Sequence, residues 1–386
     1  MSPIKIQLFR PDFGLAEQEA TRRVIDSGWV GRGALTIQFE RAFADHIGVH
    51  AAQILMLPSA TDGLFHTIKL LDLKAGDEVI LPSISFIGAA QAAVSGGASV
   101  VLADVDPHSL NPTVDNLEVA RTAHTKAVIL IHYGGTPCEM TDIMTWANHH
   151  GIIMIEDSAC SPASTFAGQA CGSFGQFAVW SFDSMKMMST VEGGAIYVKD
   201  PALMAQLRRD CALGMSSTAG HASTAAARWW EFDVTAPARR SQFNDVAAAL
   251  GLTQLARLPE MLSKRQAIVA RYNMRLQGAP WVQLPRGPRP TLPASEPRTQ
   301  DSHYFYWIQL TDGRRDALAQ YLREQGIYSS FRYFPLHRTT LFASPTPLPG
   351  ADYAADNTLN LPCHSMLSLA DVDAVADAVL DFLSTG

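Results

Sequence analysis

The chain has 386 residues, of which 47% are hydrophobic and 17% charged. This composition can bury large cores and excludes a disordered protein. At roughly 100–200 residues per domain, the length predicts two or three compact units. The formal net charge of −7 gives no electrostatic reason to expect a nucleic-acid partner. There is no zipper heptad, long basic run or short tandem repeat, so a globular enzyme or binding protein remains.

The expected location is the cytoplasm. The first residues, MSPIKIQLFRPDF, show no basic segment followed by an apolar one, so we expect no signal peptide. No apolar run reaches the ~18 residues of a membrane span, and we expect no membrane partner. The cysteine count is odd and no CxxC pair suggests a zinc site or other metal. A reduced, cytoplasmic protein is the simple interpretation of these five residues, Cys138, Cys160, Cys171, Cys211 and Cys363.

From residue 51 to about 160, short apolar runs alternate with longer helical stretches. Short buried strands joined by helices are typical of an α/β protein with a mainly parallel sheet. The predicted strands are Gln53–Leu57, Glu78–Leu81, Ser99–Ala103, Lys126–Ile131 and Ile152–Ile155. The predicted helices between them include Thr61–Leu71, Phe86–Ser95 and Glu139–His150. Ligands of such sheets bind at the carboxyl ends of the strands, so chemistry is expected at Pro58–Thr61, Pro82–Phe86, His132–Gly135 and Asp157–Cys160.

After about residue 250 the pattern changes to that of a smaller α+β domain. We therefore predict a large domain over residues 1–250 and a small C-terminal domain over 251–386. A helix from Asp245 to Leu276 is expected to be interrupted at Pro259, and the proline-rich residues 285–300 to form a surface loop. The remaining predicted elements are a strand at Tyr304–Leu310, a helix at Arg314–Gln325, a strand at Ile327–Tyr333 and a helix from Ala370.

Lys186 is the first candidate for chemistry. It lies in a stretch that is apolar on both sides, Phe177–Met188. A lysine in such surroundings must be paired or deprotonated, because burial disfavours the ammonium form. A neutral, desolvated amine is what Schiff-base chemistry with a carbonyl requires. A lysine that reaches solvent from the edge of a core explains the pattern equally well.

Asp157 is the second candidate, because it follows the predicted strand Ile152–Ile155. A pyridine cofactor needs a carboxylate that pairs with its protonated ring nitrogen. Taken alone, an aspartate at this place is more often a turn or cap residue. It gains weight only beside Lys186.

Small and hydroxylic residues in the segment Ser59–Gly63 follow one strand and open a helix. Backbone N–H groups and the dipole at a helix N-terminus suit a phosphate, and Ser181 could add a hydroxyl. An ordinary helix cap is the stronger explanation for so short a segment. Phe86 could stack on a planar ring, although a single aromatic is more often part of a core. Glu192–Gly194 allows close backbone approach or a plain turn.

Taken in chain order, these segments resemble the sugar aminotransferases of the DegT/DnrJ/EryC1/StrS family. The likeness covers essentially the whole chain, and the order and spacing of the segments make it specific. It also includes Phe39–Glu40, Gln254–Leu255 and Pro335–His337. The segments that carry it are Ser59–Gly63 (SATDG), Gly76–Pro82 (GDEVILP), Ser85–Phe86, Glu156–Ala159 (EDSA), Ser181–Lys186 (SFDSMK) and Glu192–Gly194 (EGG).

The resemblance implies a fold-type I pyridoxal 5′-phosphate (PLP) enzyme with the aspartate-aminotransferase fold, working as a homodimer with shared active sites. Lys186 would hold the cofactor as a Schiff base and later act as the acid and base. Asp157 would pair with the ring nitrogen and Phe86 would stack on the ring. The phosphate would bind to Ser181 and to the backbone of Ala60–Thr61.

The implied reaction moves an amino group from L-glutamate to a keto-sugar, usually nucleotide-linked, with pyridoxamine 5′-phosphate (PMP) as the amino-carrying form. Such enzymes serve the biosynthesis of amino sugars and cell-surface glycans such as lipopolysaccharide. The substrate-facing segment of the family falls on Arg332, Tyr333 and His337.

Three positions depart from the family pattern. Cys160 stands where many members have Gln or His near the cofactor ring, and Asp183 stands where His is frequent. Many relatives carry an Asn that reaches the phosphate bound by the neighbouring subunit. Here Arg240 or Gln242 falls near that place, with Asn244 slightly beyond it. Arginine binds phosphate well, so Arg240 is the preferred candidate.

Other functions stay open at this point. The SFDSMK run also resembles the branch that aminates keto-octulosonate sugar acids at C8, whose carboxylate could pair with Arg228, Arg239 or Arg332. A non-catalytic PLP-fold protein that binds a ligand is a second alternative. A doubly wound NAD enzyme is disfavoured because no GxGxxG follows a strand. The dehydratases of the family carry histidine in place of the lysine, so Lys186 disfavours that chemistry.

Overall fold

The computed structural model describes residues 4–215, 232–285 and 299–385. Its centre is a seven-stranded sheet with the order β1-β9-β8-β5-β4-β2-β3. All pairs from β8 to β3 are parallel, whereas β9 runs antiparallel to both of its neighbours. The strands are β1 (Ile54–Leu57), β2 (Glu78–Pro82), β3 (Ser99–Ala103), β4 (Thr125–Ile131), β5 (Ile153–Asp157), β8 (Phe177–Ser181) and β9 (Gly194–Val198).

Alternating side chains of the parallel strands enter two different cores. Val79 and Leu81 of β2 join the core that includes α3 and α4, whereas Ile80 joins the core that includes α5 and α6. Both faces of the sheet are therefore buried, as expected for strands joined by helical crossovers. The four helices are α3 (Ala60–Leu71), α4 (Ile87–Ser95), α5 (Val114–Ala120) and α6 (Met140–His150).

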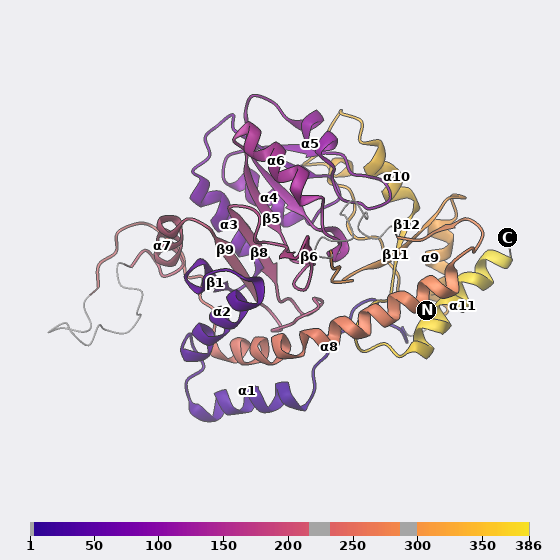
Figure 1. Cartoon of the computed structure of the whole chain (residues 1–386), viewed down its shortest axis with the longest axis horizontal. Helices are drawn as coiled ribbons and strands as arrows, with labels where there is room; N and C mark the ends of the chain where they lie inside the picture. Colours follow the sequence, from indigo (N-terminus) through magenta and orange to yellow (C-terminus); the bar gives the residue numbers. More distant parts are fainter. Residues whose placement is uncertain (1–3, 216–231, 286–298, 386) are drawn as a thin grey trace.

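The N-terminal helices and the long helix α8 (Asp245–Leu276) lie along the base of the molecule (Figure 1). α1 (Leu15–Ser27) and α2 (Ala34–Ile47) both contact α8. The remaining short elements are α7 (Pro201–Asp210), η1 (Ala51–Gln53), η2 (Tyr133–Gly135), η3 (Leu336–Arg338), β6 (Thr165–Phe166) and β7 (Gln169–Ala170).

A second, smaller sheet with the order β10-β11-β12 forms the C-terminal part. It shares an apolar core with the C-terminal half of α8, where Ile268, Tyr272 and Leu276 are buried. Its elements are β10 (Val282–Gln283), β11 (Tyr306–Leu310), β12 (Thr358–Leu361), α9 (Arg315–Glu324), α10 (Pro349–Asn357) and α11 (Leu369–Ser384). No helix in the described ranges is both long and apolar enough to cross a bilayer.

The predicted α/β class with a mainly parallel sheet is confirmed, and most predicted elements lie within a few residues of their observed bounds. The predicted interruption of α8 at Pro259 is wrong, because the helix continues through it. Leu258, Met261 and Leu262 around the proline are buried in the large core, and this packing outweighs the lost backbone hydrogen bond. α8 also crosses the predicted domain boundary at residue 250, which stays a prediction.

The predicted strand Ile327–Tyr333 is also wrong. Only two isolated bridges occur there, from Ile327 to Ile6 and from Ser330 to Asn360. Beyond them, the Arg332 N–H donates to the side chain of Asn360 at 2.7 Å, and its carbonyl accepts from the Tyr133 hydroxyl. Side chains therefore satisfy the backbone groups that a sheet partner would otherwise pair. Most of the predicted proline-rich loop, residues 286–298, lies outside the described residues.

Candidate active site

A cavity of about 170 Å³ lies at the carboxyl ends of the central strands. Larger hollows, of about 680 and 880 Å³, lie beside α5 and α6 and along β3, but neither is lined by a lysine or an arginine. The first cavity, which is lined by both cationic and anionic side chains, is therefore the better candidate for an active site. Its lining consists of Ser59, Ala60, Thr61, Leu64, Phe86, Ile131, Asp157, Ala159, Ser181, Asp183, Met185, Lys186, Glu192, Gly193, Tyr304, Arg332 and Tyr333.

Lys186 enters the cavity from the loop between β8 and β9. The loop is closed at its base, where Phe182 N donates to Gly193 O at 2.8 Å and Thr190 N donates to Phe182 O at 2.9 Å. Met187, next to Lys186, is buried in the core. The amine lies 3.6 Å from the Cys160 sulfur and 4.7 Å from the centroid of the Tyr304 ring.

The surroundings of Lys186 raise the pKa of its amine and so favour the ammonium form. Burial lowers the pKa of Lys186, whereas the ionisable groups of Cys160 and Tyr304 raise it by more. Asp157 and Asp183 act in the same direction, so the net pKa lies above its usual value. Of the two states that the sequence left open for this lysine, paired or deprotonated, the surroundings favour a paired ammonium in the protein alone.

Asp157 occupies the last position of β5 and is almost fully buried. Its carboxylate accepts from Ala159 N at 3.1 Å. Burial raises the pKa of Asp157 by more than the positive charge of Lys186 and the Ala159 N–H lower it. A buried carboxylate of this kind is suited to pair with a cationic ring nitrogen, which would favour its charged form.

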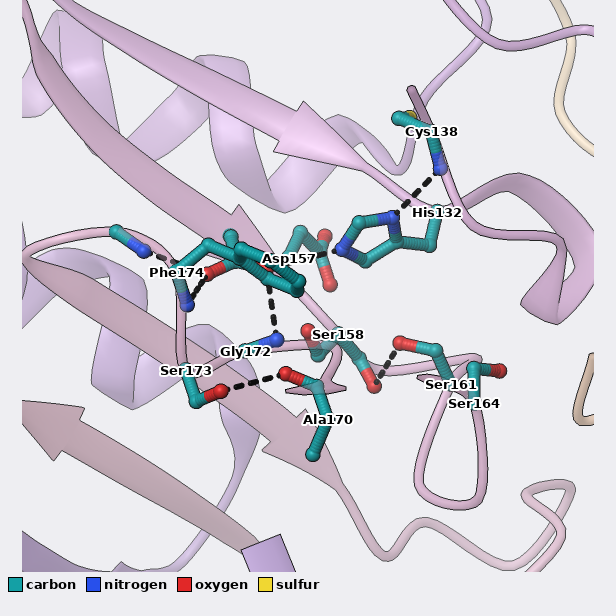
Figure 2. A network of polar contacts seen from close by, with 12 residues as sticks. His132, Cys138, Asp157, Ser158, Ser161, Ser164, Ala170, Gly172, Ser173 and Phe174 are labelled. Carbon is teal, nitrogen blue, oxygen red and sulfur yellow. Dashed lines mark hydrogen bonds and ion pairs between the residues drawn. The ribbon is translucent and has the colours of Figure 1, made fainter. Parts of the chain in front are cut away.

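Behind Asp157, the neighbouring Glu156 anchors the chain that follows β7. Its carboxylate accepts from Gly172 N at 2.7 Å and from Phe174 N and Gly175 N at 2.8 Å. A fourth contact, of 3.1 Å, joins Glu156 to Nε2 of His132. Figure 2 shows the network around His132, Gly172 and Phe174 at the end of the strand that carries Asp157.

The N-terminus of α3 forms the other end of the cavity. The Ser59 hydroxyl caps the helix by accepting from Asp62 N at 3.1 Å, so Ser59 has the ordinary cap role. The backbone N–H groups of Ala60 and Thr61 have no acceptor within the described ranges. A Cβ on Gly194 would lie only 2.4 Å from Ala60 N, so this glycine allows β9 to approach the helix end. With the hydroxyl of Ser181, these donors are suited to bind an anion.

Aromatic rings close the cavity on the remaining sides. Phe86 precedes α4 and lies edge-on to Tyr333, with ring centroids 5.9 Å apart. Tyr304 lies beneath Lys186, and burial raises its pKa to about 12 even though Lys186 lowers it. Sequence reasoning missed Tyr304, because an aromatic residue at the start of a strand is typical of a core. Arg332 brings a second cation to the lining.

Three predicted site residues do not line the cavity. Cys160 lies behind it, between the Lys186 amine and the Tyr333 hydroxyl, which is 3.9 Å from the sulfur. His337 pairs through Nδ1 with the Ser83 hydroxyl at 2.7 Å and through Nε2 with Asp352 at 3.0 Å. Both of its ring nitrogens are thus occupied, which favours a positioning role over direct substrate contact.

Arg240 is exposed and lies away from the cavity of its own chain. Its backbone forms an isolated bridge with Ala212. Of the arginines considered for a sugar acid, Arg239 pairs with Asp62 and only Arg332 reaches the lining. Arg228 lies outside the described residues.

A family model for the DegT/DnrJ/EryC1/StrS aminotransferase family matches residues 11–380. The chain belongs to this family. A dTDP-4-dehydro-2,3,6-trideoxy-D-glucose 4-aminotransferase of Saccharopolyspora spinosa is 45% identical over 96% of this chain and 95% of its own length. The spore coat polysaccharide biosynthesis protein SpsC of Bacillus subtilis (strain 168) is 30% identical over 97% of this chain and 96% of its own.

Solved structures of aminotransferases match the fold over nearly the whole chain. The aminotransferase TlmJ from Streptoalloteichus hindustanus is 44% identical, covers 98% of this chain and 99% of its own, and superimposes with a TM-score of 0.91. Spr1654 from Streptococcus pneumoniae has been solved in a PLP form and a PMP form, each 25% identical to this chain. The two cover 100% of this chain and 99% and 100% of their own, with TM-scores of 0.86 and 0.88. The predicted enzyme class, a sugar aminotransferase that uses PLP, is confirmed.

The residues of the cavity fit this cofactor. Lys186 offers the amine for covalent attachment, Asp157 the carboxylate for the ring nitrogen, and the free N–H groups of Ala60 and Thr61 with Ser181 the donors for the phosphate. Bound PLP supplies an electron sink for the electrons that a substrate carbon keeps when it loses a proton. Lys186, the one lysine among the described residues that line this cavity, would carry out that proton transfer.

Proposed function

We propose that this aminotransferase transfers an amino group from L-glutamate to the keto group of a nucleotide-linked deoxy-sugar. The observation that carries the proposal is the Lys186 amine, which lies in one cavity with Asp157 and an open helix N-terminus. The relative from S. spinosa, which aminates C4 of a dTDP-linked sugar by its name, makes a dTDP-linked 4-keto-deoxysugar the first substrate to test. Amino-sugar and surface-glycan biosynthesis, with lipopolysaccharide as one destination, would use such a product.

The C8 amination of a keto-octulosonate and a non-catalytic binding function are less well supported. A sugar acid needs cations for its carboxylate, and Arg332 is the single arginine in the lining. A diphosphate would use the same side chain, so Arg332 alone does not favour the acid. A non-catalytic protein would have no use for a buried amine that lies over the Tyr304 ring and shares a cavity with the Asp157 carboxylate.

We infer a homodimer whose subunits complete each other's sites. Large apolar side chains are exposed around the cavity mouth, among them Phe86 (41%), Met185 (41%) and Val191 (53%), and a second copy would cover them. Beside Ala60 and Thr61, the side chain of Arg239 is already paired with Asp62, so a phosphate there would need a further positive charge. Arg240 of a second subunit would supply that charge. The five free thiols support the predicted cytoplasmic location.

The reaction is tested with purified protein and PLP. We expect a visible absorption band that L-glutamate bleaches and that a dTDP-linked 4-keto-6-deoxysugar restores, with the amino sugar and 2-oxoglutarate detected by mass spectrometry. Lys186→Ala should give no band, because the amine that attaches the cofactor is lost. Lys199→Ala, at an exposed position outside the cavity, should behave as the wild type.

Three results would contradict parts of the proposal. Absence of the band in folded wild-type protein would exclude the chemistry altogether. A band that glutamate bleaches but only a keto-octulosonate restores would replace the nucleotide sugar with the sugar acid. A band that ignores glutamate would require another amino donor.

A further inference from the structure

Phe9 contacts two residues of the cavity lining without lining the cavity itself. Its ring is stacked on that of Tyr304, with centroids 5.6 Å apart and an interplanar angle of 12°. The guanidinium carbon of Arg332 lies 5.3 Å from the centroid of the Phe9 ring. Because Tyr304 also contacts the ammonium of Lys186, two aromatic rings connect the two cations of the site.

The segment that carries Phe9 is fixed by the C-terminal part of the chain. Lys5 N and Ile6 N donate to Gly326 O at 2.8 and 3.1 Å, and Tyr328 N donates to Ile6 O at 2.9 Å. Backbone hydrogen bonds therefore determine where Phe9 lies. Its ring is half-buried against the large core.

Arg332 has a fixed backbone and an available side chain. Its backbone groups are paired with Asn360 and Tyr133. Within the described ranges, no carboxylate lies within ion-pair distance of its guanidinium, whereas Arg257 pairs with both Asp12 and Glu17. The Phe9 ring is thus the main group that orients the Arg332 fork, and the donors of the fork remain free for an anion.

We propose that Phe9 is a positioning residue that holds the Arg332 guanidinium at the cavity, where it binds anionic oxygens of a substrate. Both substrates of the proposed function, on which this inference rests, carry such oxygens: L-glutamate in its carboxylates and the keto-sugar in the diphosphate of its carrier. Without the ring, the long Arg332 side chain gains rotamer freedom that anion binding must then remove. The loss falls on substrate binding and leaves the proton transfer at Lys186 unchanged.

The test uses the PLP-loaded enzyme and two non-reacting probes, glutarate for the donor carboxylates and thymidine diphosphate for the carrier. Binding is measured by calorimetry, and kcat and KM are measured for both substrates. We expect Phe9→Leu to weaken one probe about tenfold and to raise KM for the matching substrate about tenfold, with kcat within about twofold. The probe affected identifies the anion that Arg332 binds.

Matched variants separate positioning from general damage. Phe9→Trp keeps an aromatic face and should bind both probes as the wild type does. Phe13→Leu, an exposed residue of the same segment, should change neither constant. In an Arg332→Gln background, Phe9→Leu should add nothing, because the group through which it acts has been removed.

The inference is overturned if Phe9→Leu binds both probes as the wild type does, or if its effect persists in the Arg332→Gln background. It is also overturned if the loss appears in kcat with KM unchanged. The calorimetric measurement of probe binding does not depend on catalytic turnover. If the wild type turns over no keto-sugar but the probes behave as expected, the proposed function fails and the positioning role of Phe9 stands.

Discussion

Replacement of Glu156 by glutamine, which changes one carboxylate oxygen into an NH₂ group, tests the hydrogen-bond network behind Asp157. The Glu156 side chain is fully buried, and each carboxylate oxygen accepts two hydrogen bonds. One oxygen accepts from Phe174 N and Gly175 N, and the other from Gly172 N and His132 Nε2. His132 Nδ1 accepts from Cys138 N at 3.2 Å, as Figure 2 shows, so Nε2 carries the proton and donates to Glu156.

The expected loss of stability in Glu156→Gln follows from these contacts. In Glu156→Gln, the new NH₂ group faces two N–H donors in either orientation of the amide, so two hydrogen bonds are lost. Each hydrogen bond to a charged group contributes about 1.5–3 kcal/mol. Glutamine relieves part of the penalty for a buried charge, so we expect a net destabilisation of about 3 kcal/mol. At about 2.1 cal/mol/K per residue, the 386 residues have an unfolding entropy of about 0.8 kcal/mol/K, so this destabilisation lowers Tm by about 4 °C.

Calorimetry at pH 7 measures the shift, and amide hydrogen exchange at Gly172, Phe174 and Gly175 locates it. Glu19→Gln is the matched control, because Glu19 is exposed and, among the residues that the structure describes, forms an ion pair only with Arg23, at 3.6 Å. Such surface pairs contribute little, so its Tm should stay within about 2 °C of the wild type. If Glu156→Gln also stays within that range, or if exchange at the three amides is unchanged, the four-contact account of Glu156 is refuted.

Two further predictions concern pH and assembly. Burial and then Arg265 lower the pKa of His364 from 6.5 to about 4. Between these two pH values, the imidazole is therefore protonated in the unfolded chain but neutral in the folded chain. This difference should lower the free energy of unfolding by about 3 kcal/mol as the pH drops from about 6.5 to 4. His364→Gln, which can keep the hydrogen bond to Gln7 O, should remove this contribution to the pH dependence measured by urea unfolding. An unchanged pH dependence would contradict the role assigned to His364. Co-expression of Lys186→Ala and Arg240→Ala subunits should restore activity, because one site of each mixed dimer is intact; inactive mixtures of folded, dimeric variants would exclude shared sites.

The sequence was sufficient to locate the site but not to complete it. Residues at strand ends could be predicted because the carboxyl ends of parallel strands meet at one edge of a sheet, which brought Asp157, Ala60 and Thr61 together as expected. Lys186 could be assigned because a charged residue in an apolar run needs an explanation. Its family match then fixed the cofactor. These inferences depend on local patterns and on one rule of topology.

The contacts made through long-range packing could not be predicted in this way. Phe9 and Tyr304 are 295 positions apart in the sequence, and nothing in either local pattern distinguishes them from core aromatics. The segment at Ile327 has the composition of a strand, but it forms only isolated backbone bridges to Ile6 and Asn360. The backbone groups of Arg332 pair instead with the side chains of Asn360 and Tyr133. Pro259 has the local properties of a helix breaker, yet packing on both sides of it keeps α8 continuous.

The charge on Lys186 depends both on its local sequence and on long-range packing. The apolar run that identified the residue left a paired or a deprotonated amine open. Met187 and Phe182 are buried in the core, whereas the amine lies over the Tyr304 ring, 4.7 Å from its centroid. An ammonium must lose a proton before it can attack a carbonyl, so the surroundings that raise its pKa oppose the nucleophile. The same surroundings favour the later task, because a lysine that holds its proton firmly beside the reacting carbon can also return it. We therefore expect the groups that raise the pKa of Lys186 to favour its role in proton transfer over its attachment to the cofactor.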